Sequence, residues 1–170
     1  DDFVSVKDFG AKGDGITDDT EAINRALYEI YCRTLTPAAR KVLYFPGGRY
    51  IVSDGIKVPS NAILRGEGQN NTIIQQTADP NYVSYVVITA DSKQQVESQI
   101  GLNGASLPAD IIIEDMALES QFDGIWCWDA RRFTVNRVRI TGGTELPDGP
   151  GDLWAGVYIV GANLDPPNDI

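Results

Sequence analysis

Hydrophobic and polar positions follow a helical period near the N-terminus of the chain and a strand-like pattern later. Between residues 19 and 32, apolar side chains recur at the spacing of one helix face, at Ile23, Ala26, Leu27, Ile30 and Tyr31. This spacing predicts an amphipathic helix. We place its N-cap at Asp18, because Glu21 lies three residues further on, as in a capping box.

After residue 41 the chain consists of short β-prone runs separated by Gly, Asn, Asp and Pro. The predicted strands are residues 42–45, 50–52, 56–58, 62–64, 72–75, 83–89, 111–118, 125–128, 133–140 and 157–160. A further short strand is predicted at 3–6, followed by a turn through Gly10, Gly13 and Gly15, which tolerate positive φ. So many short strands with turn signals are typical of a sandwich, a barrel or a solenoid.

An internal repeat favours the solenoid. Residues 111–118 and 133–140 are 22 positions apart, and their apolar residues coincide at Ile111/Phe133, Ile113/Val135, Met116/Val138 and Leu118/Ile140. Residues 123–130 and 155–162 match at a spacing of 32, and an inserted loop at 142–152 accounts for the excess. A period in the low twenties with loop insertions predicts a β-solenoid of stacked coils.

A solenoid has an open sheet edge at each end, and unpaired backbone groups there favour aggregation unless they are covered. The amphipathic helix is a natural cover for the N-terminal end. We therefore expect residues 1–40 to form a strand, a turn and a capping helix, and residues 41–170 to form the coils. Both parts would belong to one continuous domain, which we expect to continue beyond residue 170.

Composition narrows the possible partners. The chain has 14 Lys and Arg against 24 Asp and Glu, a net charge of −10, which disfavours nucleic-acid binding. It has no apolar run long enough to span a membrane, so we expect no membrane insertion. It has no histidine, which excludes Ser-His-Asp, Cys-His and histidine-built zinc sites within this chain. Its two cysteines, Cys32 and Cys127, are predicted to be free and largely buried.

Two motifs resemble a known family. Residues 6–15, VKDFGAKGDG, followed by TDDTEAI at 17–23, are similar to the N-terminal signature of the pectate-lyase-like right-handed parallel β-helix superfamily. YFPGGRY at 44–50 and LRGEG at 64–68 resemble the first coils of that family. The resemblance implies an all-β solenoid, a right-handed parallel β-helix with an N-terminal capping helix. The signature residues are structural in the family, so no active site carries over.

Within this superfamily, the compact chain looks most like the bacteriophage tailspike and tail-fibre branch. The resemblance implies a homotrimer on the virion tail, exposed to the extracellular environment, in contact with other tail proteins and with host surface polysaccharide. The superfamily also contains pectin-degrading enzymes, fungal glucanases and capsule depolymerases. The alternative hypothesis is therefore a polysaccharide depolymerase, either hydrolase or lyase. A third hypothesis is a secreted plant- or fungal-wall glycosidase. The fold alone does not choose among these functions, because one fold serves all of them.

Candidate catalytic groups are scarce. The glycine-rich turn lies beside acidic residues that would repel phosphate, and we expect neither a cofactor nor a metal. A glycosidase needs two carboxylates roughly 5 to 10 Å apart. The candidates are Asp115, Glu119, Asp123, Asp129, Asp148 and Asp152. We interpret them as solvated turn acids, with Asp115 in a salt bridge to Arg137, and the cluster of Arg131, Arg132, Arg137 and Arg139 as solvated strand positions.

The aromatic residues of the last coils are better candidates for binding. Alternation along a strand places Ile125, Cys127, Val157 and Ile159 inside the solenoid. The outward residues are then Trp126, Trp128 and Tyr158, with Trp154 at the end of the inserted loop and Asp123 and Asp129 nearby. Such a group suits stacking on a sugar with hydrogen bonds to its hydroxyls, and it equally suits a trimer interface or internal packing.

Overall fold

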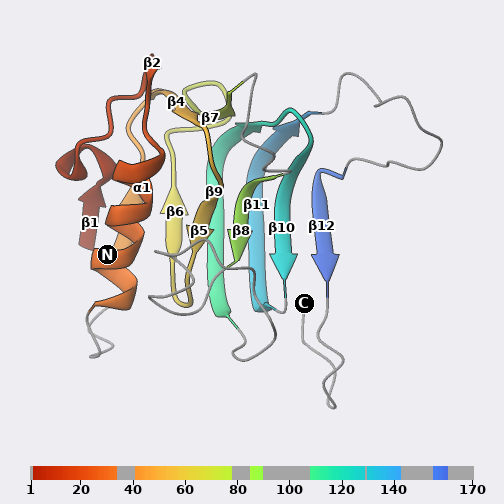
Figure 1. The fold of residues 1–170 in the computed structure, drawn as a ribbon. Coiled ribbons are helices and arrows are strands. Elements are labelled where there is room, and N and C mark those ends of the chain that lie inside the picture. Colours follow the sequence, from red (N-terminus) through yellow and green to blue (C-terminus); the bar gives the residue numbers. More distant parts are fainter. Residues whose placement is uncertain are drawn as a thin grey trace.

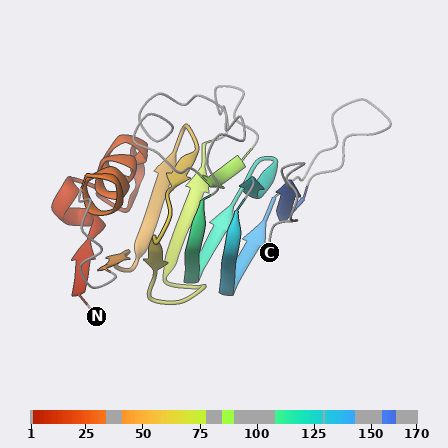
Figure 2. The same cartoon turned by 90° about the horizontal axis from the view of Figure 1, so that it is seen from below.

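The computed structural model describes residues 2–33, 41–77, 85–89, 108–128, 130–142 and 155–160. The strands stack along one axis, from β1 and helix α1 at one end to β12 at the other (Figure 1). The view from below shows them in facing layers (Figure 2). Every pair among the described strands is parallel, which is the arrangement of successive coils in a β-helix.

The strands are β1 (Asp2–Ser5), β2 (Asp14–Asp18), β3 (Lys41–Tyr44), β4 (Gly48–Val52), β5 (Ile56–Val58), β6 (Ile63–Arg65), β7 (Thr72–Gln76), β8 (Tyr85–Thr89), β9 (Ala109–Glu119), β10 (Asp123–Trp128), β11 (Arg131–Thr141) and β12 (Val157–Val160). The helical segments are η1 (Val6–Phe9), a 3₁₀ turn, α1 (Thr20–Leu27), and η2 (Tyr28–Cys32), a π-helical continuation of α1. The predicted strands in the described residues are confirmed to within two residues at each end.

The strands form two sheets. The larger has the order β1-β3-β6-β9-β7-β4-β2, with β11 added to β9, and the smaller has the order β12-β10-β8-β5. In the larger sheet, β9 pairs with β6 through its first half and with β7 through its second half. One long strand therefore lies on two short strands of the preceding coil, and it bends between them at Asp115, where φ is +58°.

The bends recur at equivalent positions in the next coil. Asp110 and Asp115 in β9 and Arg132 and Arg137 in β11 all have positive φ, which is uncommon for residues other than glycine. Each acid accepts two hydrogen bonds from the arginine 22 residues later, at 2.7 and 2.8 Å for Asp110 and at 2.5 and 2.8 Å for Asp115. Charge-assisted bidentate pairs thus join the bends of adjacent coils. The predicted Asp115–Arg137 salt bridge is confirmed.

The register confirms both predicted repeats. Ile111 lies beside Phe133 and Leu118 beside Ile140, at the spacing of 22. Ile125 lies beside Val157 at the spacing of 32. Apolar positions coincide in the sequence because equivalent residues stack on one another across the coils.

The N-terminal helix covers the start of the core as predicted. Ile23, Ala26 and Leu27 are fully buried. The helix begins at Thr20, so the N-cap position is Asp19 and the prediction of Asp18 is wrong by one residue. The buried Asp19 carboxylate instead accepts hydrogen bonds from the backbone N–H groups of Lys12 and Gly13, at 2.7 and 2.9 Å. The Asp19 carboxylate therefore binds the glycine-rich turn and makes no capping hydrogen bond to the first turn of α1.

Helix α1 also pairs with an open backbone edge. Strand β5 is the last strand of the smaller sheet on the N-terminal side. The Asn24 side chain donates to the carbonyl of Gly55 at 3.2 Å and accepts from the N–H of Lys57 at 2.9 Å. The Thr20 hydroxyl accepts from the N–H of Ser53 at 2.9 Å. Side chains of the helix thus take the place of a neighbouring strand.

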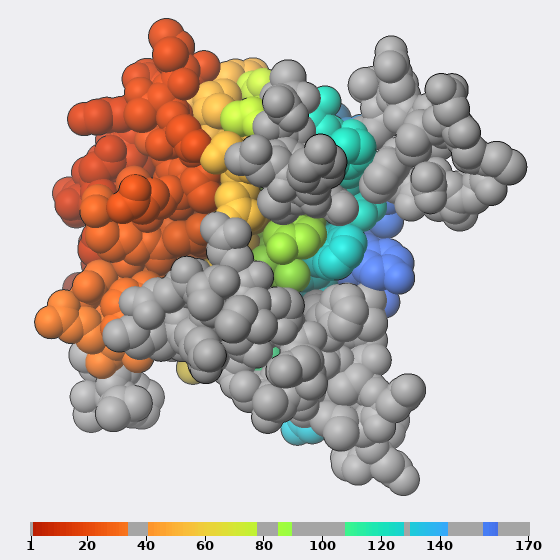
Figure 3. All heavy atoms as spheres, in the orientation of Figure 1, coloured from red at the N-terminus to blue at the C-terminus, as the bar shows by residue number. Residues whose placement is uncertain are grey.

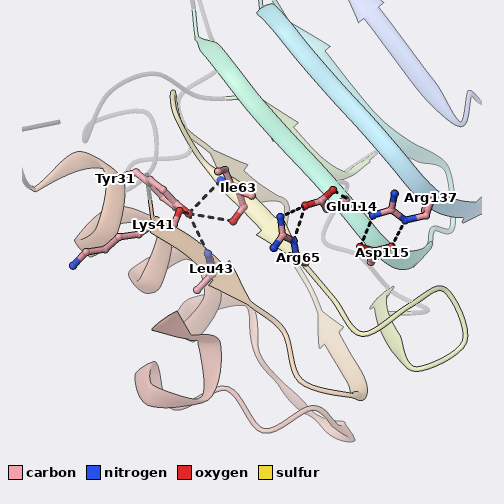
Figure 4. Close-up of polar contacts among 8 residues, drawn as sticks. All are labelled: Tyr31, Lys41, Leu43, Ile63, Arg65, Glu114, Asp115 and Arg137. Atoms are coloured by element: carbon pink, nitrogen blue, oxygen red, sulfur yellow. Dashed lines mark hydrogen bonds and ion pairs between the residues drawn. The ribbon is translucent and has the colours of Figure 1, made fainter. Parts of the chain in front are cut away.

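Tyr31, in η2, anchors the other end of the cap. Its hydroxyl lies 2.7 Å from the carbonyl oxygen of Lys41 and 3.2 Å from the backbone nitrogens of Leu43 and Ile63 (Figure 4). These groups belong to β3 and β6, which are strands of the larger sheet. Because Asn24 pairs with the β5 edge of the smaller sheet, the cap is held against both sheets.

The glycine-rich turn contains a strand that the sequence did not predict. Gly13 and Gly15 have φ of +63° and +77°, and a Cβ on Gly13 would lie 2.8 Å from the Tyr50 ring. Strand β2 begins directly after Gly13, includes Gly15, and pairs with β4. The Asp14 carboxylate accepts from the N–H groups of Ile16 and Thr17, and these bonds lower the pKa of Asp14 to about 2. β2 is mostly exposed, so its pattern carries no apolar signal.

Candidate functional site

The outer face of the smaller sheet changes character from one end to the other. Lys57, Ile88, Trp126 and Tyr158 occupy one row across β5, β8, β10 and β12. Lys57 and Ile88 are 4% and 8% exposed, and Tyr158 is 47% exposed. Side chains of η2 contact Ile88. The cap therefore covers the start of this row and leaves its end accessible.

Three aromatic side chains form a continuous stack on this face, which we call the aromatic strip: Tyr85, Trp126 and Tyr158. The ring centroids of Tyr85 and Trp126 are 4.9 Å apart, and those of Trp126 and Tyr158 are 5.7 Å apart, with tilts of 45° and 44°. Atoms of β8, β10 and β12 (lime, teal and blue) reach the surface on the face of the molecule drawn in Figure 3. Aromatic ring pairs at such centroid distances stabilise a fold by about 0.5–1.5 kcal/mol each, beyond the effect of burying their surface area.

Asp123 fixes the middle ring of the strip. Its Oδ2 accepts a hydrogen bond from Trp126 Nε1 at 2.8 Å, and its Oδ1 accepts one from the backbone N–H of Ala155 at 2.6 Å. The Asp123 residue is 6% exposed. Because both oxygens are engaged and buried, this carboxylate orients the indole and links β10 to the start of the next coil.

The charged groups near the strip are mainly acidic. Besides Asp123, Asp54 lies close enough for its charge to act on Tyr85, whose pKa is raised first by burial and then by Asp54. The buried ammonium group of Lys57 is paired with Asp54, at 3.3 Å. The charge of Lys57, the described cation near the aromatic strip, is therefore neutralised by Asp54.

The structure brings together three of the predicted site residues: Trp126, Tyr158 and Asp123. Trp128 lies in β10, but its side chain lies outside the described part of the structure, as do Trp154 and Asp129. The predicted interior positions Ile125 and Cys127 are fully buried. Val157 and Ile159 are 37% and 52% exposed, because β12 has no further neighbour among the described strands.

Sequence reasoning missed Tyr85. It lies in β8, beside Asp123 of β10, and its ring reaches Trp126 from there. The spacing from Tyr85 to Asp123 is 38 residues, far from the period of 22. A long insertion between β8 and β9 hides this coil from a repeat search, so no alignment signal marks Tyr85.

The described candidate catalytic carboxylates are all engaged by other groups of the protein: Asp123 accepts hydrogen bonds from Trp126 and Ala155, and the other two are in ion pairs. Asp115 is bound by Arg137, whose hydrogen bonds and charge lower its pKa, and Glu119 pairs with Arg49. Asp148 and Asp152, like Asp129, lie outside the described residues. Within the described ranges, the structure shows no group of three or more His, Cys, Asp or Glu side chains that could hold a metal ion.

Two arginines of the β11 cluster, Arg132 and Arg137, are paired with acids. Arg137 contacts Asp115 and lies 3.6 Å from Glu114, which in turn binds Arg65 at 2.6 Å (Figure 4). Arg139 donates to the side-chain oxygen of Asn70 at 3.1 Å. The side chains of Arg65, Glu114, Arg137 and Asp115 thus form a network of alternating charge on the outer face of the larger sheet.

No helix in the described parts of the chain is both long enough and apolar enough to cross a membrane.

Comparison with known proteins shows which family this chain belongs to. The family described as Rhamnogalacturonase A/epimerase, pectate lyase-like, matches residues 3–106. The chain belongs to this pectate-lyase-like family. The predicted right-handed parallel β-helix with a capping helix is therefore confirmed, although the cap is short.

The proteins similar to this chain include phage proteins and an enzyme. The pre-neck appendage protein of Bacillus phage phi29 is 43% identical over 72 residues, which are 42% of this chain and 7% of that protein. Alginate lyase 7 of Azotobacter vinelandii is 40% identical over 78 residues, 42% of this chain and 8% of that protein. The structure of ORF18 of Geobacillus virus E2 superposes with a TM-score of 0.63 and 29% identity, covering 80% of this chain and 25% of that one. The chain thus spans a small part of each relative.

Proposed function

We propose that this chain is a structural segment of a bacteriophage tail appendage and resides in the virion. The similarity to the phi29 pre-neck appendage protein supports this assignment, as does the structural likeness to ORF18 of Geobacillus virus E2. A parallel β-helix suits the task, because stacked coils give a rigid rod with a continuous outer surface. Within the appendage, the segment would contact other tail proteins.

The same proposal assigns host-surface glycan attachment to the aromatic strip. The observation that carries it is the stack of Tyr85, Trp126 and Tyr158, ordered by the Asp123 carboxylate and open at Tyr158. Rigid aromatic rings held before binding lose little conformational entropy when a ligand arrives. Trp128, Trp154 and Asp129 are further candidates for the same surface, and Asp123 supports the rings rather than the ligand.

A binding measurement tests this assignment. Glycans prepared from the host cell surface would be titrated into the chain while tryptophan fluorescence is recorded. Tyr158→Ala is expected to weaken binding by about tenfold, since a stacked ring contributes roughly 1.5 kcal/mol or more when it is covered. Phe3→Ala, which removes another exposed ring on β1, is the matched control and should leave binding unchanged. Equal affinity of all three proteins would contradict a role for the strip.

We further propose that the chain assembles as a homotrimer, as the phage branch suggests. Light scattering coupled to size exclusion measures the mass directly, and a stable monomer would refute this part. The strip would then be tested as an interface. If Tyr158→Ala lowers the mass of the assembly, the strip serves subunit contact rather than glycan contact.

A second candidate function is cleavage of a surface polysaccharide by hydrolysis or elimination. The similarity to alginate lyase 7 favours it. The described carboxylates argue against it, because Asp115 and Glu119 are each held by an arginine. Release of reducing ends, or a rise in ultraviolet absorbance from an unsaturated product, on a panel of bacterial polysaccharides would establish the enzyme.

A further inference from the structure

We infer that the aromatic strip takes an uncharged sugar, which stacks the apolar face of its ring on Tyr158. This inference rests on the proposed glycan-attachment function and names its ligand class. Three features of the described residues carry it: the accessibility of each ring, the charges beside the strip, and the state of the arginines on the other sheet.

The rings are not equally available. Trp126 lies between Tyr85 and Tyr158, with centroid distances of 4.9 and 5.7 Å, so neighbours cover both of its faces. Tyr158 has Trp126 on one side, and it is 47% exposed. The electron-rich face of an aromatic ring attracts C–H groups of positive character, such as those on the apolar side of a sugar ring. Tyr158 is therefore the stacking residue, and Trp126 and Asp123 are positioning residues.

The local charges select against acidic sugars. Asp123 and Asp54 are the described acids next to the strip, and the one described cation in the row, Lys57, is buried and paired with Asp54 at 3.3 Å. The chain as a whole carries a net charge of −10. Because Asp54 and Lys57 neutralise each other, a uronate, sulfate or phosphate group approaching Tyr158 would be repelled by Asp123 at short range and by the net charge of the chain at long range.

Two arginines of the larger sheet are already occupied by acids and offer no free site for an anion. Arg132 and Arg137 lie on β11 of the larger sheet, and each is committed to a bidentate pair, with Asp110 and Asp115. An anionic ligand would have to displace a carboxylate that two hydrogen bonds already hold. An uncharged ligand has no such competitor at the strip.

The experiment compares uncharged and acidic probes on the whole chain. Cellohexaose and hexa-N-acetylchitohexaose represent uncharged sugars, and hexagalacturonate represents acidic ones, each titrated at low and at high salt. We expect an uncharged probe to bind with a Kd that salt changes by less than about twofold, because no charge pair forms. Tyr158→Ala should weaken it about tenfold, and Tyr158→Phe, which keeps the ring, less than about twofold. Phe3→Ala should match the unmodified chain.

The outcomes separate the two levels of the proposal. If hexagalacturonate alone binds, weakens with salt and responds to Arg137→Gln but not to Tyr158→Ala, the ligand class is wrong and glycan attachment stands. If an uncharged probe binds equally well to Tyr158→Ala, the stacking residue is wrong. If the probes and the host-surface glycans all fail to bind, the proposed glycan-attachment function itself fails.

Discussion

The two ends of the described β-helix solve the same edge problem differently. At the N-terminal end, α1 covers β5, and the Asn24 side chain pairs with the backbone of Gly55 and Lys57. At the other end, no described strand pairs with the far side of β12, and Tyr158 and Ile159 are about half exposed. The first end is closed by side chains that imitate a strand. Among the described residues, the second end has a strand with no neighbour on its far side and an exposed aromatic side chain.

This difference shows that a sheet edge is satisfied by hydrogen-bonding groups at the right spacing, whatever their source. An asparagine amide carries one donor and one acceptor in the same plane, as a peptide unit does. A single Asn24 side chain can therefore pair with two backbone groups of an edge strand. Edges without such a partner are the places where proteins associate.

The largest test of the comparison removes apolar volume at each end. Ile23→Ala is expected to lower the free energy of unfolding by about 2–5 kcal/mol, because Ile23 is fully buried between α1 and the core. Ile159→Ala, at a 52% exposed position in β12, should change it by less than about 0.5 kcal/mol. Urea unfolding followed by circular dichroism measures both. Similar losses would mean that the two ends are equally well packed.

A second test adds a methyl group at each end. Gly13→Ala places a Cβ at φ +63° and 2.8 Å from the Tyr50 ring, and we expect a loss of about 1–3 kcal/mol. Gly156→Ala, next to β12, meets nothing closer than 3.9 Å. It should be neutral or slightly stabilising, by up to about 1 kcal/mol, because alanine reduces the freedom of the unfolded chain. Thermal unfolding of the two variants compares them, and a destabilised Gly156→Ala would show that the β12 end is tighter than described.

The third test opens the closed end. Asn24→Leu keeps the approximate size of the side chain and leaves Lys57 N–H and Gly55 C=O without their partner, at a cost of about 1–2 kcal/mol. The uncovered edge should also promote association, which dynamic light scattering detects. Glu21→Ala, on the exposed side of the first turn of the same helix, is the control; it should leave the size unchanged and cost only about 0.3 kcal/mol of stability. A monodisperse and stable Asn24→Leu would show that the pairing is incidental.

The smallest effect concerns the pairs that join the coils between the two ends. Arg137 lowers the pKa of Asp115, so the pair stabilises the fold above the ordinary aspartate pKa of about 3.9 and loses this effect as the pH falls through the lowered value. Arg137→Gln should return the pKa of Asp115 towards its ordinary range, as seen by NMR titration of the carboxyl carbon. Arg139→Gln changes an arginine that binds Asn70 and should leave Asp115 as it is. An unchanged pKa in Arg137→Gln would contradict the pairing.

The sequence predicted most where residues stack on their equivalents. The coincidence of Ile111 with Phe133 and of Ile125 with Val157 predicted the register of β9, β10, β11 and β12, because each interior position repeats its environment in the next coil. It predicted least where neither an apolar pattern nor a glycine marks the conformation. The strand β2 has an exposed polar pattern, and Asp110 and Arg132 adopt positive φ without a glycine to announce it.

The sequence likewise predicted some residues of the candidate site and missed others. Outward positions for Trp126 and Tyr158 followed from alternation along the strands, and the structure brings their rings together. Tyr85 was missed, because the insertion before β9 breaks the repeat between its coil and the next. The role of Asp123 was also hidden, since a carboxylate in a sequence does not show whether it faces a ligand or a neighbouring indole.

By itself, the sequence determined the capping helix, the period of 22 residues and the inward and outward faces of the strands, because these depend on local spacing. Only the tertiary structure decided that Asn24 pairs with a strand edge more than thirty residues away, that Asp123 holds Trp126, and that Tyr158 keeps an open face. Those outcomes depend on how the chain closes each coil upon the last. The length and path of the loops set that closure, and periodicity carries no information about either.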